Sequence, residues 1–333
     1  MRVFRDGEKD VDPRLICKRS LAIIGYGNQG RAHALNLRDS GVGNVTIGAR
    51  PGSANIGRAE AEGFQVLGPG AAAATADLVM ILTPDETQGK LYEEELAGNL
   101  KPGATIGFAH GLAVHFSIIV PRQDLDVILV APKGPGAALR DLYQKGMGMP
   151  ALFGIAQDVS GSAKALALSY GSALGCGRAG LIESSFGEEC ETDLFSEQVV
   201  LCGGLPGLIK AAFEILVESG YSPQVAYIEC LHEVKQIADL LWEGGLQHMD
   251  ESISNTAEFG GYLAADRIVN DQVRKEMRAI LEDVKSGRFV KALMSDTETG
   301  AKDLHRRRQA DAAHPIEEPG REVRALMEWL RKK

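Results

Sequence analysis

Residues 20–41, SLAIIGYGNQGRAHALNLRDSG, set the architecture of the first half of the chain. An apolar run of strand length leads directly into Gly25-Tyr26-Gly27-Asn28-Gln29-Gly30, and the apolar spacing after it is helical over 29–39. A strand, G-x-G-x-x-G and a helix in this order are typical of a dinucleotide-binding turn, in which the glycines allow the tight turn, the approach of the pyrophosphate and the packing of helix on strand. An ordinary strand-to-helix turn, or a site for an adenylate alone, is the alternative that the glycines leave open.

The rest of the chain divides into an alternating half and a helical half. Runs of strand length with helical spacings between them are typical of a parallel α/β sheet. These runs are 20–25, 44–49, 64–67, 77–82, 104–109, 126–131 and 150–155. Beyond about residue 160, long amphipathic patterns take over, at 160–174, 192–219, 223–243, 255–286 and 321–331. We therefore expect an α/β Rossmann-type dinucleotide-binding domain over residues 1–185 and an all-α domain over 186–333.

Composition limits the class of protein. A length of 333 residues suits two domains, and 44% hydrophobic with 24% charged residues is ordinary for a soluble globular protein. A net charge of −9 argues against a general nucleic-acid binder. The chain shows no apolar signal-peptide core and no run long enough to span a bilayer, and its five scattered cysteines contain no C-x-x-C pair. We expect a cytoplasmic protein with neither nucleic-acid nor membrane partners.

The loop after the second expected strand, Gly48–Asn55, bears on the choice of nucleotide. NAD sites usually carry Asp or Glu there to bind the ribose hydroxyls. Here Arg50 supplies positive charge, and Ser53 and Asn55 supply donors for a 2′-phosphate. NADPH is therefore the expected cofactor. Because Asn55 equally suits a ribose hydroxyl, and an arginine can lie in solvent or stack on adenine, NADH or the use of both nucleotides stays open.

Two pairs of carboxylates extend apolar helical stripes in the second half. Asp193 and Glu197 stand four residues apart, and Glu229 and Glu233 repeat the spacing, which puts each pair on one helical face. Like charges repel at that spacing, and more strongly once desolvated, so a cation is expected between them. Carboxylate oxygens without nearby thiol or imidazole pairs favour Mg²⁺, with two ions if one carboxylate bridges. Two solvated helix faces are the alternative.

These features together closely resemble the ketol-acid reductoisomerase (acetohydroxy-acid isomeroreductase) family in its short bacterial and archaeal form. The matching motifs cover nearly the whole chain and include GYGNQG, LTPDETQ, AHG, APKGPG, RAGLIESSFGEECETDLFSEQ, ECLHEVK and SISNTAEFG. The resemblance implies a Mg²⁺-dependent alkyl migration of 2-acetolactate or 2-aceto-2-hydroxybutyrate. Reduction by NADPH then gives a dihydroxy acid of the valine and isoleucine pathway. The resemblance also implies a knotted helical domain, formed by two intertwined chains, and hence a homodimer at least.

The resemblance implies roles for individual residues as well. Asp193 matches the carboxylate that bridges two Mg²⁺ ions, Glu197 matches a ligand of one ion, and Glu229 and Glu233 match the ligands that the second subunit provides. Ser254 matches the residue that hydrogen-bonds the substrate, although its local sequence also suits a helix N-cap. The nucleotide-contacting positions are Tyr26, Gly27, Asn28, Gln29, Arg50, Ser53, Asp85, Glu86, Thr87, Gln88 and Gly136.

His110 and Lys133 correspond to the family's active-site histidine and lysine. Both follow expected strand ends, where open α/β sheets bind their ligands. Lys133 could stabilise developing negative charge, and His110 could relay a proton or anchor the cofactor side. A solvated lysine and a hydrogen-bonded loop histidine are the alternatives. The base for the migration stays open between Glu233 and a metal-bound hydroxide.

Two other classes of protein share parts of this pattern. A metal-independent dehydrogenase of the 6-phosphogluconate or β-hydroxyacid type also joins a dinucleotide domain to a helical domain, but it needs none of the four acids. A non-catalytic nucleotide sensor would keep the glycine turn and lose the chemistry, whereas this chain keeps the acids, His110 and Lys133. Departures from the common family pattern fall at positions that ligate no metal, namely Asn28, Arg31, Asn55, Ala113 and Ala137.

Overall fold

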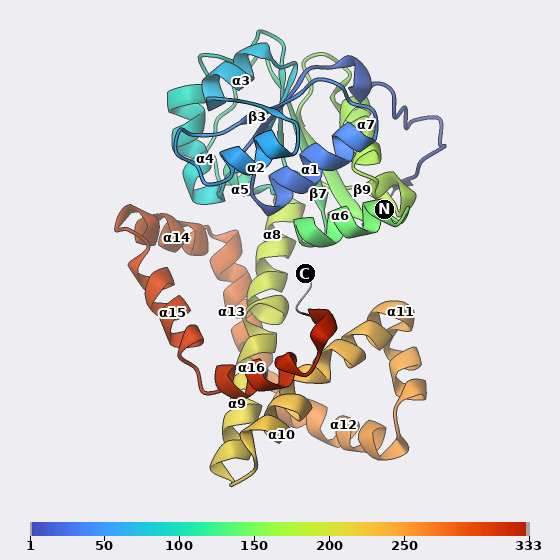
Figure 1. Cartoon of the computed structure of the whole chain (residues 1–333), viewed down its shortest axis with the longest axis vertical. Coiled ribbons are helices and arrows are strands. Elements are labelled where there is room, and N and C mark those ends of the chain that lie inside the picture. The colour runs from blue at the N-terminus through green and yellow to red at the C-terminus, as the bar shows by residue number, and fades with distance from the viewer. Residues whose placement is uncertain (1, 331–333) are drawn as a thin grey trace. The chain divides into compact units, whose positions relative to one another are not determined.

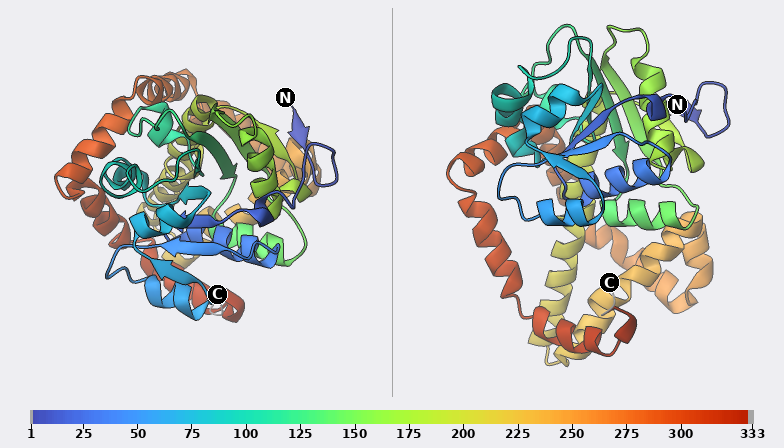
Figure 2. Two further views of the ribbon diagram at one scale, coloured as in Figure 1. Left: turned by 90° about the horizontal axis from the view of Figure 1, so that it is seen from above. Right: turned by 45° about the horizontal axis from the view of Figure 1, so that its top comes forward.

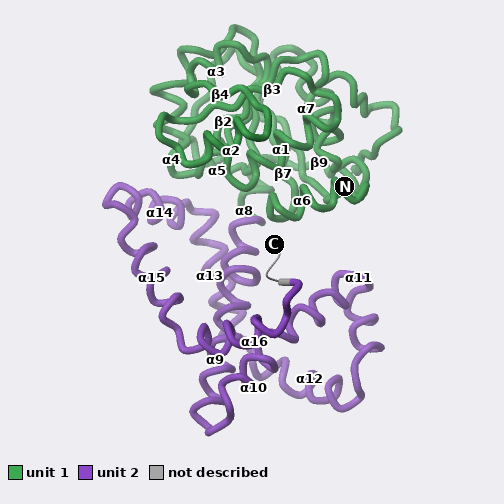
Figure 3. The backbone as a smooth tube through the Cα atoms, in the orientation of Figure 1, with its two compact units in different colours: residues 1–192 green, residues 193–333 purple. Residues whose placement is uncertain are grey.

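The computed structural model describes residues 2–330. The chain folds into two compact units, residues 1–192 and 193–333 (Figure 3). The division falls inside helix α8 (Phe186–Ser196), which runs on from the first unit into the second. The expected domain boundary at 185/186 lies at the start of the same helix.

Unit 1, whose strands β3, β7 and β9 are labelled in Figure 1, is built around one sheet. Within residues 2–330 this sheet has nine strands in the order β1-β9-β8-β7-β6-β5-β2-β3-β4. The strands are β1 (Val3–Phe4), β2 (Leu21–Ile24), β3 (Val45–Gly48), β4 (Gln65–Leu67), β5 (Leu78–Ile81), β6 (Thr105–Phe108), β7 (Asp126–Pro132), β8 (Ala151–Gln157) and β9 (Leu181–Glu183). The seven predicted strands are therefore present. Strand β1, at one edge of the sheet, and strand β9, between β1 and β8, were not predicted.

The prediction of a parallel sheet is wrong for one side of it. Strands β2 to β7 pair in parallel, but β8 is antiparallel to β7, and β1 is antiparallel to β9. Helix α6 (Gly136–Gln144) follows β7 and packs along α1 (Asn28–Asp39) instead of returning to the amino edge. The Lys133 N–H donates to the Pro150 carbonyl at 2.9 Å, so the segment that joins β7 to β8 begins and ends at the same edge of the sheet. Strand β8 must therefore run back beside β7, and the sheet is mixed.

Two apolar clusters cover the two faces of the sheet. Ile23 and Met80 face a cluster that includes side chains of α1 and α7, whereas Ile24 and Ile81 face the cluster of α3 and α4. This alternation follows from the period of two in a strand, and both faces are buried because helices cover both (Figure 2). The other helices of unit 1 are α2 (Ile56–Ala61), α3 (Pro69–Thr75), α4 (Asp85–Leu91), the π-helical turn η2 (Tyr92–Leu96), α5 (Leu112–His115) and α7 (Ala163–Ala173).

Unit 2 is helical throughout its described residues. It contains the end of α8, the π-helical turns η4 (Glu197–Leu201) and η5 (Ile228–His232), α9 (Gly204–Glu218), α10 (Pro223–Tyr227), α11 (Val234–Ser252), α12 (Asn255–Ile268), α13 (Asp271–Lys285), α14 (Arg288–Glu298), α15 (Lys302–Ala312) and α16 (Glu317–Ala325). The sequence patterns did not predict α14 and α15. Helix α15, KDLHRRRQADA, has no apolar stripe from which a period could be read.

The core of unit 2 is small. One buried cluster joins Phe213 of α9 and Tyr227 of α10 to Val323 of α16. Nineteen large apolar side chains among residues 193–329 are more than a third exposed, including Trp242 at 83% and Leu246 at 73%. The helical stretch Phe186–Glu218 is, within the described residues, long and apolar enough to cross a membrane by length and composition alone, and only 6% of its most apolar window is buried.

Candidate functional site

The glycine-rich turn between β2 and α1 has the geometry that its sequence predicts. Gly25 has φ +99, which L side chains rarely adopt, and a Cβ on Gly30 would lie 2.0 Å from the Gly25 carbonyl oxygen. A Cβ on Gly27 would meet no atom within 4 Å. Gly27 is also the N-cap of α1 and makes no side-chain cap, so the first N–H groups of this helix are available to an anion. The first and third glycines thus allow the tight turn and the close packing of helix on strand, and the second leaves space in which a ligand can approach the backbone.

The loop after β7 presses against this turn. The Gln29 side-chain nitrogen donates to the Gly134 carbonyl at 2.9 Å. A Cβ on Gly136 would lie 2.1 Å from the Asn28 carbonyl oxygen, so only glycine fits there. Gly136 therefore allows α6 to pack closely against the start of α1.

Three buried side-chain oxygens at the carboxyl ends of β2 and β5 have no hydrogen-bond partner among the described protein atoms. They belong to Gln29, Thr83 and Gln88. Unsatisfied buried oxygens are uncommon and call for a ligand or ordered water. Together with the open space at Gly27, they fit a bound dinucleotide along this edge.

The LTPDETQ motif lies at the same edge. The Gln88 side-chain nitrogen donates to the Thr83 carbonyl at 2.9 Å and to Asp85 Oδ1 at 3.0 Å. Thr87 Oγ1 donates to the Pro84 carbonyl, and Glu86 lies half-buried in the first turn of α4. Gln88 is buried, and these two hydrogen bonds fix the conformation of the loop. Thr83, whose orphaned hydroxyl lies beside it, was missed by the sequence reasoning.

The loop after β3 carries the residues expected to choose the nucleotide. Arg50 is exposed and Ser53 is half-buried. The Ser53 N–H donates to the Arg50 carbonyl at 3.1 Å, and Asn55 lies at the start of α2, where its N–H is 3.4 Å from Ser53 Oγ. The three residues therefore share one tight turn at the carboxyl end of β3.

His110 and Lys133 lie just after β6 and β7, as predicted, and a third residue joins them. Glu189 of α8 accepts a hydrogen bond from Lys133 Nζ at 2.6 Å on Oε1. Its Oε2 accepts from the Gly111 N–H at 2.7 Å and lies 3.1 Å from His110 Nδ1. The Glu189 side chain is 1% exposed. One buried carboxylate therefore orients both predicted catalytic side chains.

The electrostatics of this triad favour an ionised carboxylate. Burial raises the pKa of Glu189, but the His110 hydrogen bond and the charges of His110 and Lys133 outweigh it, so the pKa lies below its usual value. An ionised carboxylate only accepts hydrogen bonds, so His110 Nδ1 carries a hydrogen. Nε2 is then the ring atom left for other chemistry.

The sequence reasoning missed Glu189, although a signal was present. Glu189, Asp193 and Glu197 stand at i, i+4 and i+8, so the ladder of acids on one face begins a turn earlier than the predicted pair. Ligand atoms of His110, Glu189 and Asp193 lie within 4.8 Å of one another, a group able to hold a metal ion. Asp193 is placed there by α8 itself, one turn after Glu189.

The four predicted metal ligands are not brought together within one chain. Among the described residues, no cluster of three or more potential ligands includes Glu197, Glu229 or Glu233, and all three are exposed. Glu229 lies within the π-helical turn η5, and the Glu233 N–H donates to the Ile228 carbonyl five residues back. The second pair therefore spans a wider turn than the α-helix on which the shared face was predicted.

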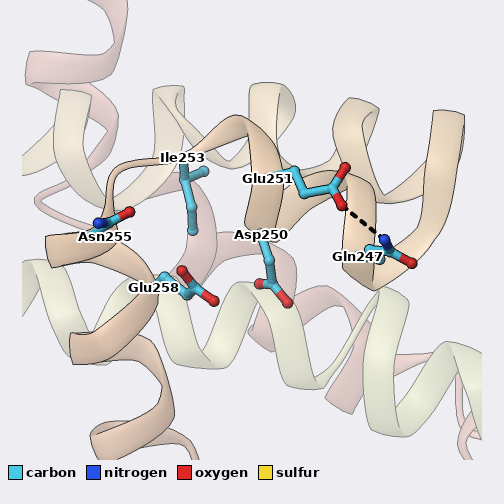
Figure 4. A pocket seen from close by; sticks show the side chains of 6 residues that line it. All are labelled: Gln247, Asp250, Glu251, Ile253, Asn255 and Glu258. Atoms are coloured by element: carbon cyan, nitrogen blue, oxygen red, sulfur yellow. Dashed lines mark hydrogen bonds between the residues drawn. The ribbon is translucent and has the colours of Figure 1, made fainter.

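Ser254 caps α12 in the way its local sequence suggests. Its Oγ accepts a hydrogen bond from the Ala257 N–H at 3.2 Å. An acidic hollow flanks it, and Figure 4 shows the side chains that line it: Gln247, Asp250, Glu251, Ile253, Asn255 and Glu258. The Tyr262 hydroxyl bridges two of these acids, Asp250 at 3.0 Å and Glu258 at 3.1 Å.

Comparisons with known proteins cover both units. Residues 15–180 match the family model described as acetohydroxy acid isomeroreductase, NADPH-binding domain, and residues 186–329 match that of the ketol-acid reductoisomerase C-terminal domain. The solved structure of an NADH-preferring ketol-acid reductoisomerase from an uncultured archean has a TM-score of 0.94 and 41% identity, and the match covers 98% of this chain and 99% of that one.

More distant structures share only the fold. A semialdehyde dehydrogenase NAD-binding protein from Cupriavidus necator has a TM-score of 0.60 and 18% identity over 81% of this chain and 99% of its own. A pyrroline-5-carboxylate reductase from Coxiella burnetii has a TM-score of 0.58 and 16% identity over 80% of this chain and 98% of its own.

Proposed function

The chain belongs to the ketol-acid reductoisomerase family, and we propose that it converts 2-acetolactate or 2-aceto-2-hydroxybutyrate into 2,3-dihydroxyisovalerate or 2,3-dihydroxy-3-methylvalerate. An alkyl migration comes first and a reduction by a nicotinamide nucleotide second, as steps of valine and isoleucine biosynthesis. The observation that carries the proposal is the buried Glu189, which holds Lys133 and His110 at the carboxyl edge of the sheet. The nucleotide turn lies on the same edge.

We propose that Asp193 and Glu197 of one subunit, with Glu229 and Glu233 of a second, hold two Mg²⁺ ions. The donor set fits, because all four side chains are carboxylates, and hard divalent cations prefer oxygen ligands. Glu189 is already engaged by two side chains and a backbone N–H, which leaves Asp193 as the ligand of that cluster. Bound Mg²⁺ supplies Lewis acidity toward the two neighbouring oxygens of an acetohydroxy acid.

The residues of this chain do the positioning and proton work. Lys133, held at 2.6 Å by Glu189, donates hydrogen bonds to the substrate oxygen on which negative charge develops during migration. His110 keeps its Nδ1 hydrogen on Glu189 and, when the ring is protonated on both nitrogens, donates its Nε2 proton to the substrate oxygen after reduction, which leaves a neutral ring. Glu233 acts as the base that takes the substrate hydroxyl proton. Ser254 hydrogen-bonds the substrate carboxylate or hydroxyl.

NADPH is the proposed reductant. Arg50 and Ser53 lie in one turn at the carboxyl end of β3 and offer a cation and a hydroxyl to a 2′-phosphate, and the loop Gly48–Asn55 carries no carboxylate. The nucleotide supplies a hydride to the rearranged ketone. NADH is the alternative, since the solved relative at 41% identity prefers it.

A second copy of this chain is the proposed partner. The exposed apolar side chains of unit 2 are too many for a surface left in water, and among the described residues no third potential ligand joins Glu229 and Glu233. A homodimer buries these apolar side chains and brings the two carboxylate pairs together. The scattered spacing of the five cysteines suits the reducing cytoplasm, where we propose that the enzyme works.

The test is oxidation of NADPH and of NADH with 2-acetolactate, with Mg²⁺ present and after chelation. We expect turnover that chelation abolishes and that Glu229→Gln reduces at least a hundredfold, whereas Glu93→Gln, at an exposed position of η2 in unit 1, is the matched control. Turnover that survives chelation would instead indicate a metal-independent dehydrogenase. Nucleotide binding without turnover would indicate a sensor.

A further inference from the structure

An ion pair beside the nucleotide turn is not used by the proposed reaction. Arg31, in the first turns of α1, donates from Nε to both Glu62 oxygens, at 2.9 and 3.1 Å, and from a terminal nitrogen to Oε1 at 2.5 Å. The Tyr26 hydroxyl, inside the glycine turn, donates to Glu62 Oε2 at 2.6 Å. Glu62 caps the C-terminal end of α2, so one carboxylate fastens α2 to the turn and to α1.

This carboxylate balances a group of arginines. Arg58 Nε lies 4.0 Å from Glu62 Oε1, and Arg38 donates to the Glu62 backbone carbonyl at 2.6 Å. Hydrogen bonds from Arg31 and Tyr26 hold the pKa of Glu62 below its usual value, so the carboxylate stays charged. The side chain is 22% exposed, and its field is therefore only partly screened by water.

The pair lies on the adenosine side of the nucleotide site. Tyr26 belongs to the turn that receives the pyrophosphate, and α2 follows directly on the loop of Arg50, Ser53 and Asn55. The 2′-position of the adenosine ribose is where NADPH and NADH differ, by a phosphate of nearly two negative charges. A change in charge at this pair acts on the pyrophosphate of both nucleotides alike, but only NADPH carries the 2′-phosphate, so the ratio of the two affinities changes.

We propose that the Arg31–Glu62 pair is a specificity-determining element that sets the ratio of NADPH to NADH affinity through the charge it places beside the 2′-position. The inference rests on the proposed function, because it requires a nicotinamide nucleotide in this site. Arg31 and Glu62 act through their charge and their hold on the loop, and neither touches the reacting atoms. They are positioning residues.

The two single substitutions have opposite expected signs. Glu62→Gln removes one negative charge and favours NADPH, whereas Arg31→Gln removes one positive charge and favours NADH. One unit charge about 8 Å from a dianion in water changes the affinity about fivefold without salt. Screening at 0.1 M salt reduces this to about twofold, so each ratio shifts by about that factor. Arg31→Gln combined with Glu62→Gln restores neutrality and returns the ratio toward that of the wild type.

The experiment measures dissociation constants of NADPH and NADH by fluorescence titration, without metal or substrate, for the full chain and the three variants. Asp124→Asn is the matched control. It also frees an arginine, Arg122, from a carboxylate 2.7 Å away, but it lies before β7 at the opposite edge of the sheet. Seven residues of strand separate the edges by about 23 Å, beyond the Debye length of about 10 Å at 0.1 M salt.

Opposite shifts in the two single variants, near-restoration in the double variant and smaller shifts at 0.5 M salt would support the proposal. Equal shifts of one sign, or none, would overturn it, because a merely structural pair weakens both nucleotides alike. If Glu62→Gln fails to fold, Arg31→Gln and the charge-conserving Glu62→Asp, which is expected to keep the wild-type ratio, still decide it. Failure of the wild type to bind either nucleotide would overturn the proposed function along with it.

Discussion

The two units differ in how far each completes its own interior. Among residues 2–329, large apolar side chains that are more than a third exposed number three in unit 1, namely Val120, Met147 and Val159, and nineteen in unit 2. Unit 1 closes its core on both faces of the sheet, and its functional side chains are oriented by its own contacts. Unit 2 leaves its apolar faces and three of its four candidate metal ligands exposed. Each difference is explained if unit 2 is completed by a second copy.

The largest loss of activity should come from substitutions of the proposed metal ligands. These substitutions test directly whether a second copy of the chain completes the site of unit 2. Asp193→Asn and Glu229→Gln should each lower turnover about a hundredfold to a thousandfold, because each removes a proposed ligand. If the two residues come from different subunits, co-expression of the variants gives dimers that contain one intact site. About half of the wild-type activity per dimer should then return, as measured with heterodimers purified through two different tags. No recovery would show that both ligands come from one chain.

The next effect concerns the exposed face of α11. Trp242→Glu with Leu246→Glu places charge on side chains that are 83% and 73% exposed in one chain and buried in the proposed dimer. A symmetric dimer contains each of these side chains twice, once in each subunit, so the substitutions place four charges in the interface. Dimerisation should therefore weaken at least a hundredfold, and activity should fall with it. Analytical ultracentrifugation measures this. Val120→Glu, at 75% exposure in unit 1, is the control and should leave the dimer intact.

Glu189 allows the self-contained unit 1 to be tested in turn. Glu189→Gln keeps the shape but lowers the charge that holds Lys133 and His110, and kcat should fall about tenfold to a hundredfold with little change in nucleotide affinity. Steady-state kinetics with separate nucleotide titration checks this. An unchanged kcat would contradict the role of Glu189 as the residue that orients the two side chains.

The same carboxylate predicts an acid dependence of stability. The pKa of Glu189 is lowered in the folded chain, so its ionised form stabilises the fold above the ordinary value of 4.5, and this stabilisation is lost as the pH falls through the folded value. Thermal melts between pH 3 and 6 should therefore show a smaller acid loss for Glu189→Gln than for the wild type. Equal slopes would mean that other carboxylates govern the acid loss.

The weakest effect is expected at Ser254. Ser254→Ala removes the N-cap of α12 and should lower the free energy of unfolding by about 1 kcal/mol. Ser254→Asp retains a cap and separates the two roles: it should restore stability without restoring the KM for 2-acetolactate. A KM that follows stability in both variants would mean that Ser254 is a cap and nothing more.

Sequence patterns were informative wherever the signal was local. The seven predicted strands and the turn from Gly25 to Gly30 follow from apolar runs and glycines within a few residues of one another. His110 and Lys133 were placed correctly because parallel strands end at a common edge. The direction of β8 was not predictable in this way, since it depends on where α6 packs.

The amino-acid order alone was enough to identify the family, the glycine-rich turn and the acids at helical spacing, because each depends on short-range chain geometry and on residue chemistry. The folded chain was needed to show that Glu189 joins His110 and Lys133, which are 79 and 56 residues away along the chain, and that Glu62 pairs with Arg31 across 31 residues. Periodicity constrains contacts within one helix or strand. Contacts between elements arise from the packing of the whole sheet and its helices, which no local pattern encodes.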